Sequence, residues 1–437
     1  MSSSGLSASY PQHVAALERA YAHVLAEHRF DGVVIASGRA TIKNRFDDQW
    51  WPLAVTPTFS HWLPLREPDA ALVIVPGKRP RLVRVKHEDY WDSAPQAESD
   101  HFWDAFDVVE VASAAEIARH LPEGHVALVA SEEPAFEPPG AVNPAPLVAA
   151  LEKLRTHKSE YELACLAIAT ARAVRGHRAA ADAFAARGGS ELALHLAYLA
   201  ASEQDDGDTP YKNIVARGRH AAVLHHVVYD KHAPAADADS LLVDAGAQCL
   251  GYASDITRTY VRGGGDDATR FRALVAAVER LQQQICSEIK PGLAYEALHD
   301  RSHQLLGEAL VELGLGTGSA AELVERGVTR ALFPHGLGHS LGLQVHDVGM
   351  RPHAPRADNR FLRNTSVIEV GQVFTIEPGC YFIEQLLAPL RADERRGLLD
   401  WALVDRLAPF GGVRIEDDVV VLADGIRNLT REAWAAA

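Results

Sequence analysis

The chain has 437 residues, of which 47% are hydrophobic and 23% are charged, and its formal net charge is -15. This composition is typical of a globular protein and excludes a collagen-like or largely disordered chain. The negative charge argues against nucleic acid or an anionic membrane as the partner, because both attract basic surfaces. The four cysteines are scattered without a C-x-x-C pair, so we expect neither a disulfide framework nor a thiolate metal site.

The start of the chain, MSSSGLSASYPQH, lacks the basic residues and apolar core of a signal peptide. No stretch has the ~20 consecutive apolar residues that a membrane helix needs. We therefore expect a cytoplasmic protein that does not enter a membrane.

The first third of the chain has the pattern of a small α/β domain. Apolar residues at helical spacing predict a helix over residues 10–27, and apolar runs predict buried strands within residues 31–38 and 125–131. Residues 70–85 are predicted to form two strands joined by a turn that contains Pro and Gly.

The segment EPPGAVNPAP, residues 137–146, is typical of a connection between domains. We therefore predict an N-terminal α/β domain over residues 1–147 and a second domain over residues 148–437. The second domain combines covering helices with strands that carry polar residues, which favours an α+β fold over a doubly wound parallel sheet.

Capping signals locate the first helices of the second domain. Ser159 and Glu162 fit a capping box at the start of a helix that runs to about residue 187, and Ser190 is a candidate cap for the helix after it. Two later helices are predicted over residues 269–289 and 295–313. Strands are predicted within residues 213–216, 222–229, 240–246, 373–382 and 412–422.

Asp244 and Asp255 stand at the ends of apolar runs in LLVDAGAQCLGYASDITRTYV. A simple hairpin that pairs them directly would turn near Cys249 and Leu250, with their Cβ atoms roughly 4.5–5.5 Å apart. Two carboxylates this close repel each other, and a divalent cation between them removes the repulsion. A single aspartate would more often be a turn or surface residue, but the pair favours a metal site.

Three histidines, His335, His339 and His346, occur within twelve residues of the segment FPHGLGHSLGLQVHDVG. A lone histidine in apolar surroundings is more often a core residue than a ligand, but three together favour a site that binds metal or carries protons. His335 and His339 have the spacing of a zinc pair, yet the glutamate of H-E-x-x-H is absent. The residues alone do not decide which histidine would be the ligand.

Glu377 and Glu416 lie within the strand patterns VFTIEPGCYF and GVRIEDDVVVL. A glutamate among apolar residues is costly to bury unless it has a partner, and a salt bridge with Arg414 is the simplest alternative for Glu416. Together with the two aspartates and a histidine, these carboxylates form the ligand set of two divalent ions. Such ions lie roughly 3.5–4 Å apart and hold a nucleophilic water between them.

The ordered motifs Asp, Asp, HGLGH, TIEPG and RIEDD resemble those of the metallopeptidases with the pita-bread fold, which include methionine aminopeptidase, aminopeptidase P and prolidase. Within them the chain is most similar to the bacterial Xaa-Pro dipeptidases, nearly from end to end. The resemblance implies a C-terminal pita-bread (creatinase/aminopeptidase-like) catalytic domain after a smaller α/β domain. It also implies hydrolysis of Xaa-Pro dipeptides with two divalent ions, usually Mn²⁺, in a homodimer.

The resemblance implies roles for individual residues. The implied metal ligands are Asp244, Asp255, His339, Glu377 and Glu416, with Asp255 and Glu416 touching both ions. Glu377 is also expected to act as general base, with His346 and His225 stabilising the oxyanion. The implied substrate-binding residues are Tyr211, Arg414, His335 and Asp48 (or its neighbour Asp47), the last reaching into the partner's site in related dimers.

The chain departs from the family at His226, where the relatives have tyrosine, and we expect this to change the pocket wall or a local pKa. Arg414 has the alternative role of orienting Glu416. Three other functions are compatible with the fold. They are an aminopeptidase P that acts on longer Xaa-Pro peptides, a non-enzymatic pita-bread binding module, and a creatinase-like hydrolase.

Overall fold

The structure is a computed structural model, and it describes residues 3–46, 48–86, 91, 99–187, 189–205, 207–234 and 239–437. Backbone contacts divide the chain into two compact units, Met1–Cys165 and Leu166–Ala437. The predicted domain boundary at residues 147/148 precedes this division and stays a prediction.

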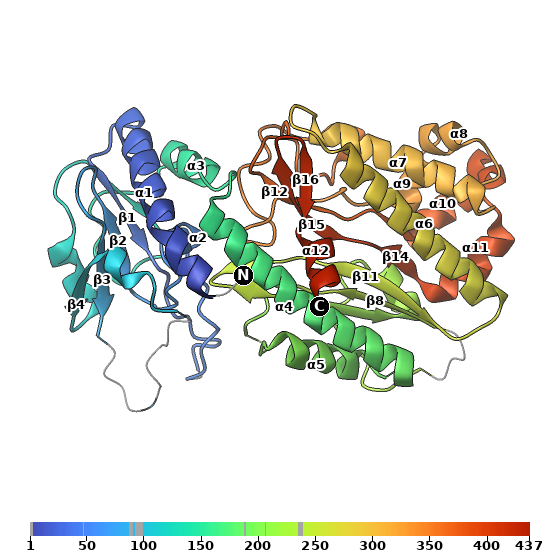
Figure 1. Ribbon diagram of the computed structural model, residues 1–437, viewed down its shortest axis with the longest axis horizontal. Helices are drawn as coiled ribbons and strands as arrows, with labels where there is room; N and C mark the ends of the chain where they lie inside the picture. Colours follow the sequence, from blue (N-terminus) through green and yellow to red (C-terminus); the bar gives the residue numbers. More distant parts are fainter. Residues whose placement is uncertain are drawn as a thin grey trace. The chain divides into compact units, whose positions relative to one another are not determined.

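The N-terminal unit is built on a six-stranded mixed sheet in the order β4-β3-β2-β1-β5-β6 (Figure 1). Its strands are β1 (Gly32–Ala36), β2 (Ala71–Ile74), β3 (Arg81–Val85), β4 (Asp107–Val111), β5 (Val126–Val129) and β6 (Ala141–Val142). Its helical segments are α1 (Ser3–Glu27), α2 (Pro57–Ser60), η1 (Trp103–Ala105), η2 (Ala114–His120) and α3 (Ala145–Lys153). The apolar strands β1, β2 and β5 are buried along their whole length, as their composition predicts.

The C-terminal unit contains short antiparallel sheets that together carry the polar residues of interest. One sheet contains β7 (Ile214–Arg217), β8 (Asp239–Asp244) and β11 (Thr257–Arg262), in the order β11-β8-β7. The others are β9 (Gln248–Cys249), β10 (Tyr252–Ala253), β12 (Val373–Ile376), β13 (Gly379–Tyr381), β14 (Gly412–Arg414), β15 (Asp417–Leu422) and β16 (Gly425–Asn428). A bridge between Thr257 and Glu416 connects β11 to the later strands.

Helices surround these strands. They are α4 (Glu160–Arg187), α5 (Glu191–Ser202), α6 (Asp266–Glu288), α7 (Tyr295–Glu312), α8 (Ala320–Glu325), α9 (Val328–Leu332), α10 (Glu384–Ala392), α11 (Trp401–Leu407) and α12 (Leu429–Ala436). Shorter 3₁₀ turns are η3 (Gly218–Ala222), η4 (Ala357–Asn359), η5 (Glu394–Leu398) and η6 (Ala408–Phe410). Helix α6 packs its buried apolar side against β11, β12 and β14, whereas α5 packs on β7 (Figure 1).

The predicted caps at the start of α4 and α5 are confirmed. The backbone N–H of Ser159 donates to Glu162 Oε2 at 2.8 Å, and that of Glu162 donates to Ser159 Oγ at 3.4 Å, which completes a capping box. Ser190 Oγ accepts from the backbone of Ala193 at 3.1 Å.

The predicted strand over residues 222–229 is wrong. The segment follows the 3₁₀ turn η3 and continues in turns, with Val223, Val227 and Val228 exposed. Its path is set by Glu191, which accepts hydrogen bonds from the backbone N–H groups of Arg217 and Asp230 on either side. These tertiary bonds override the local preference of valine for extended structure.

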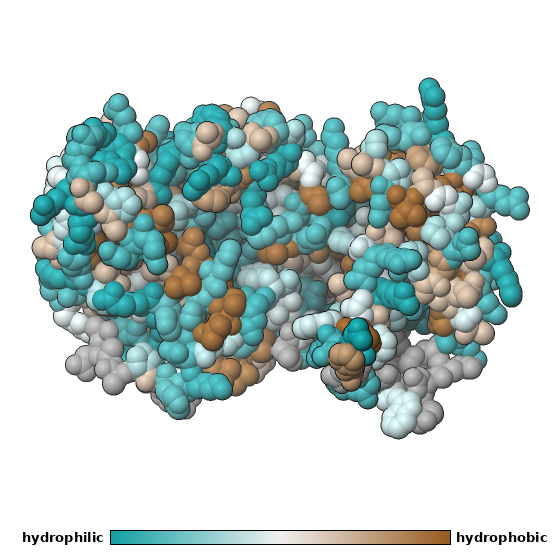
Figure 2. Space-filling model, turned by 180° about the vertical axis from the view of Figure 1, so that it is seen from behind, coloured by the Kyte–Doolittle hydropathy of each residue, from teal (hydrophilic) through white to brown (hydrophobic). Residues whose placement is uncertain are grey.

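None of the described helices is long and apolar enough to cross a membrane. On the face drawn in Figure 2, hydrophobic residues form small groups among mostly hydrophilic ones. Scattered apolar groups of this kind are ordinary on protein surfaces and need no special partner.

Candidate metal centre

Asp244 and Asp255 lie on the same face of a β-hairpin, although they do not pair directly. Asp244 pairs with Thr257, and the tight turn lies at Leu250 and Gly251, whose φ angles of 52° and 87° suit a two-residue hairpin loop. The predicted direct pairing is therefore wrong, and Asp255 is the diagonal neighbour of Asp244. The register differs from the predicted one by two residues, and a shift of two keeps every side chain on its face.

Glu377 and Glu416 lie opposite one another where two pairs of strands are interrupted. The last residue of β12 pairs with the first of β15, and the first residue of β13 pairs with the last of β14. The two glutamates occupy the break between these pairs in the same register. The loop that carries His339 joins them, because the backbone N–H of Thr375 donates to the carbonyl of His339 at 2.9 Å.

Three of the other four predicted ligands converge on the imidazole of His339. Its Nε2 atom lies 3.4 Å from Asp255 Oδ2, 3.7 Å from Glu377 Oε1 and 3.9 Å from Glu416 Oε1. One ligand atom from each of Asp255, His339 and Glu416 lies within 4.8 Å of the other two. This spacing is that of side chains able to share a metal ion.

Asp244 is held beside Asp255 by Tyr211 and Arg414. The Tyr211 hydroxyl lies 2.8 Å from Asp244 Oδ1 and 2.5 Å from Asp255 Oδ1. Because a hydroxyl has one proton, it donates to only one of these carboxylates at a time. On the other side, Arg414 Nη2 donates to Asp244 Oδ2 from a buried position.

The carboxylates outweigh the cationic side chains around them. Burial and repulsion from the neighbouring aspartate raise the pKa of Asp255, and burial and the other carboxylates raise that of Glu416 well above its usual value. Burial is also the main reason that the pKa of Glu377 rises to about 7. The cluster contains four carboxylates, and the positive charges that oppose them come from Arg414 and His339. Carboxylate oxygens with one imidazole are a donor set for Mn²⁺, Co²⁺ or Zn²⁺, so these residues fit two divalent ions.

His335 borders the carboxylates without joining them. Its Nδ1 atom lies 3.6 Å from Glu377 Oε2, and its Nε2 atom lies 2.8 Å from the Tyr381 hydroxyl. Burial, followed by repulsion from Arg414, lowers the pKa of His335 to about 3. His335 is therefore a neutral hydrogen-bonding group at neutral pH.

His346 lies directly beside the centre, and His225 is linked to it by electrostatic repulsion. The ring of His346 lies edge-on to that of His339, with their centroids 4.4 Å apart. Burial is the main reason that the pKa of His346 falls to about 3. Repulsion from His339, Arg363 and His225 lowers it further. His225, an exposed residue, also contributes to the lowered pKa of His335.

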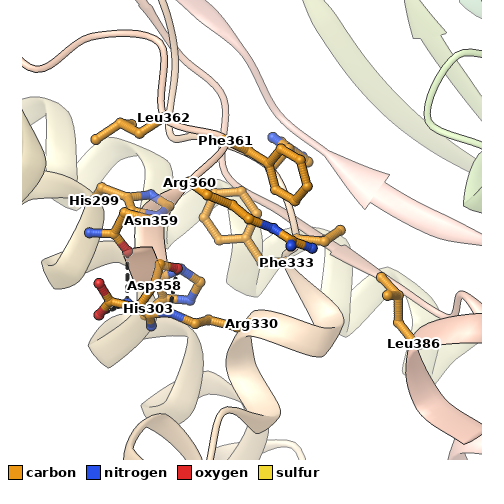
Figure 3. Close-up of a pocket in the computed structure, with 12 residues that line it drawn as sticks. His299, His303, Arg330, Phe333, Asp358, Asn359, Arg360, Phe361, Leu362 and Leu386 are labelled. Atoms are coloured by element: carbon orange, nitrogen blue, oxygen red, sulfur yellow. Dashed lines mark hydrogen bonds and ion pairs between the residues drawn. The ribbon is translucent and has the colours of Figure 1, made fainter. Parts of the chain in front are cut away.

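A cavity of about 230 Å³ opens beside His335 (Figure 3). His299 and His303 line it from α7, beside the segment that carries Asn359, and Arg330 Nη2 donates to Asn359 Oδ1 at 2.8 Å. The carboxylates of the centre do not line this cavity. His335 lines this cavity and also lies beside Glu377, so it borders both the centre and a side pocket of aromatic and polar residues.

Two other positions named by the sequence are Asp48 and His226. Asp48 is an exposed residue of the N-terminal unit, and its place in a partner's site stays a prediction; Asp47 lies outside the described residues. His226 lies in the C-terminal unit with its Nε2 atom 2.8 Å from Glu191 Oε2. The departure from the family's tyrosine therefore affects the surroundings of Glu191, whose pKa the imidazole helps to lower.

No role was predicted for three residues that support the centre, although one of them, Asp418, ends the RIEDD motif. Thr257 Oγ1 donates to Glu416 Oε2 at 2.6 Å, and the Tyr381 hydroxyl accepts from Arg414 Nη1 at 2.9 Å. Asp418 accepts from the backbone N–H of Asp255 at 3.2 Å. The sequence offered a signal for Asp418, an acidic residue beside the apolar run VVVL, and all three residues are fully buried.

Two family models match the chain. Residues 164–423 match metallopeptidase family M24, and residues 8–152 match the N-terminal domain of Xaa-Pro dipeptidases. The chain belongs to metallopeptidase family M24. The predicted pita-bread domain behind a smaller N-terminal domain is confirmed, as is the prediction of a hydrolase that uses divalent metal ions.

This M24 chain is similar over nearly its full length to proteins named Xaa-Pro dipeptidase. It is 42% identical to one from Stenotrophomonas maltophilia over an alignment of 441 residues that covers 98% of each chain. It is 38% identical to one from Pseudoalteromonas atlantica, with 97% of this chain and 98% of the relative covered. The predicted resemblance to the bacterial Xaa-Pro dipeptidases is therefore confirmed.

Solved structures of aminopeptidases share the fold of this M24 chain. Aminopeptidase P from E. coli has a TM-score of 0.73 at 22% identity, and an aminopeptidase of Pseudomonas aeruginosa has a TM-score of 0.72 at 24% identity. In both cases the match covers 98% of this chain and 97% of the other. At these identities the likeness concerns the fold alone.

Proposed function

We propose that the chain hydrolyses Xaa-Pro dipeptides at a centre of two divalent cations. The ligands are Asp244, Asp255, His339, Glu377 and Glu416. The observation that carries this proposal is the convergence of three carboxylates on His339 Nε2, with Asp244 held beside them. The near full-length similarity to proteins named Xaa-Pro dipeptidase supports the substrate class.

Glu377 is the general base of this proposal. The ions, when bound, would acidify a water molecule and polarise the scissile carbonyl. Among the four carboxylates Glu377 is the most accessible, with its side chain 16% exposed against 2% for Glu416. It accepts a proton from the attacking water and passes it to the proline nitrogen as the C–N bond breaks. The water oxygen remains in the new carboxylate of the released first residue.

His346 and His225 are assigned to the developing oxyanion. The ring of His346 lies edge-on to that of the ligand His339, and His225 is near enough to help lower the pKa of His346. The lowered pKa of His346 keeps its ring neutral at neutral pH, so it donates one N–H without adding a fixed charge. A hydrogen bond aimed at the oxygen where charge develops is stronger in the transition state than in the ground state.

Arg414 is assigned a positioning role, which was the alternative to substrate binding. Its guanidinium already donates to Asp244, Thr257 and Tyr381 from a buried position. Arg363 is the better candidate for the C-terminal carboxylate of the dipeptide. Its charge reaches His346, its side chain is exposed, and within the described part of the chain no hydrogen bond or ion pair engages it.

The second candidate function is release of the first residue from longer Xaa-Pro peptides, as in aminopeptidase P. The shared fold supports it, but identity to aminopeptidases is 22–24%, against 38–42% to the dipeptidases. Comparing the hydrolysis of Ala-Pro with that of Ala-Pro-Ala separates the two. We expect cleavage of Ala-Pro alone, and faster cleavage of the tripeptide would favour the aminopeptidase.

We also propose Mn²⁺ as the preferred ion and a cytoplasmic homodimer in which Asp48 reaches the partner's site. The carboxylate-rich donor set supports Mn²⁺ while admitting Co²⁺, Zn²⁺ or Fe²⁺. Restoring each ion to metal-stripped protein tests the first point. Light scattering of the wild type, combined with the KM of Asp48→Ala, tests the second.

A further inference from the structure

A second group of potential metal ligands lies at the start of α5, outside the carboxylate centre. Glu191 Oε1 lies 2.8 Å from His220 Nδ1, and Glu191 Oε2 lies 2.8 Å from His226 Nε2. The two imidazoles stack with centroids 4.2 Å apart and planes 25° from parallel. One ligand atom from each of the three residues lies within 4.8 Å of the other two.

Glu191 is fixed before any ion arrives. Its side chain is 1% exposed, and it accepts hydrogen bonds from the backbone N–H groups of Arg217 at 2.9 Å and Asp230 at 2.8 Å. Burial alone would raise the pKa of Glu191, but these two bonds and the two imidazoles outweigh burial and lower it. The group therefore presents an ionised, immobile carboxylate to two imidazole nitrogens.

The opposite side of the group is open. His220 is 39% exposed and His226 is 10% exposed, so an ion can approach from solvent. The exposed carboxylate of Asp230 lies with Oδ2 3.9 Å from His220 Nδ1, within reach of a shared ion. Two imidazoles and one or two carboxylates, completed by water, form a tetrahedral ligand set for Zn²⁺.

We propose that Glu191, His220 and His226 bind one Zn²⁺ ion, or a similar borderline divalent ion, at a site separate from the catalytic centre. The site shares no ligand with that centre, so it does not rest on the proposed function. The bound ion ties η3 and the segment after it to the start of α5. That segment carries His225, so the ion stabilises the backbone that presents this residue.

The first test counts zinc ions bound per full-length chain at equilibrium with buffered free Zn²⁺. The variants are His220→Asn combined with His226→Asn, and His232→Asn as a matched control at a nearby exposed histidine. We expect the wild type and the control to bind one ion more than the double variant. Equal counts in the wild type and the double variant would overturn the proposal.

The second test isolates the site by removing the shared ligands of the main centre, with Asp255→Asn and Glu416→Gln. We expect Co²⁺ to give a visible absorption band at one equivalent in this folded protein. The band should disappear when His220→Asn and His226→Asn are added. Absence of the band before that addition overturns the proposal. Ala-Pro hydrolysis by the wild type is measured separately, so a failure of the proposed function is distinguishable.

Discussion

Glu377 and Glu416 lie opposite one another at the break between β12 and β13 and between β14 and β15. Like charges facing each other in a sheet are destabilising, and burial raises the pKa of both side chains. Thr257 donates to Glu416, and the imidazole of His339 lies 3.7 Å from Glu377, which reduces the repulsion. Such a pairing is expected where the two carboxylates meet across a metal ion.

Replacement of Glu377 by Gln tests its role as general base. The amide keeps the size of the side chain but cannot take a proton, so kcat for Ala-Pro should fall by about 10²–10⁴-fold or more. Metal content per chain is measured on the same sample. Full activity in a variant that keeps its metal would contradict the assignment.

The metal-free protein should lose stability as the pH rises from about 5 to about 8. The pKa of Glu377 is raised to about 7 in the folded state from an ordinary value of 4.5, so the folded state binds more protons than the unfolded state in this range. Burial acts to lower the pKa of His339, but Asp255 and Glu377 outweigh burial and raise it to about 9. The protonated imidazole therefore stabilises the folded state, and this contribution is also lost as the pH rises.

This pH dependence is measured as the midpoint of thermal unfolding with a chelator present, and again with Mn²⁺ restored. Bound cations neutralise the carboxylates, so with Mn²⁺ the fall in Tm with rising pH should be smaller or reversed. The difference in Tm between the two samples should therefore grow with pH. A metal-free protein whose Tm stays constant or rises over this range would argue against a repulsive carboxylate cluster.

Arg414 should matter for stability more than for substrate affinity. Arg414→Met leaves the buried Asp244 without its ionic partner, and removing one partner of a buried pair costs about 3–5 kcal/mol. Arg414→Lys keeps the positive charge but not the planar guanidinium with its several N–H donors, so the loss of unfolding free energy should be smaller than in Arg414→Met. Denaturant unfolding of both variants measures the effect. A raised KM with unchanged stability would instead indicate contact with the substrate.

Arg363 should govern recognition of the substrate carboxylate. A hydrogen bond to a charged group contributes about 1.5–3 kcal/mol, so Arg363→Ala should raise KM for Ala-Pro about 10–100-fold with a smaller change in kcat. With Ala-Pro amide, which lacks the carboxylate, wild type and variant should differ little. Arg351→Ala, at another exposed arginine, is the matched control. Equal losses on both substrates would exclude this role.

The main strands, and the four carboxylates as candidate ligands, could be predicted because the pattern that indicates them lies within a few neighbouring residues. Asp244, Asp255, Glu377 and Glu416 each interrupt or end an apolar run, and a buried charge in such a run needs a partner. The neighbouring residues did not show which of the three histidines would be the ligand. The choice of His339 depended on family resemblance; in the structure, His339 Nε2 faces three of the carboxylates.

Other features could not be predicted because distant residues set them. The hairpin register follows from the turn at Leu250 and Gly251, which local apolar patterns do not specify to within two residues. Residues 222–229 have the composition of a strand, but Glu191 holds the chain on either side of them. Arg363 lies in a segment without regular structure, so no periodic pattern pointed to it.

The rate of Ala-Pro hydrolysis by metal-stripped protein, before and after Mn²⁺ is restored, tests the central claim most directly. We predict no hydrolysis in the stripped protein and full recovery with Mn²⁺, and no recovery when Asp255→Asn and Glu416→Gln are both present. Hydrolysis at the full rate in stripped protein, or by the metal-treated double variant, would contradict a centre built on these side chains.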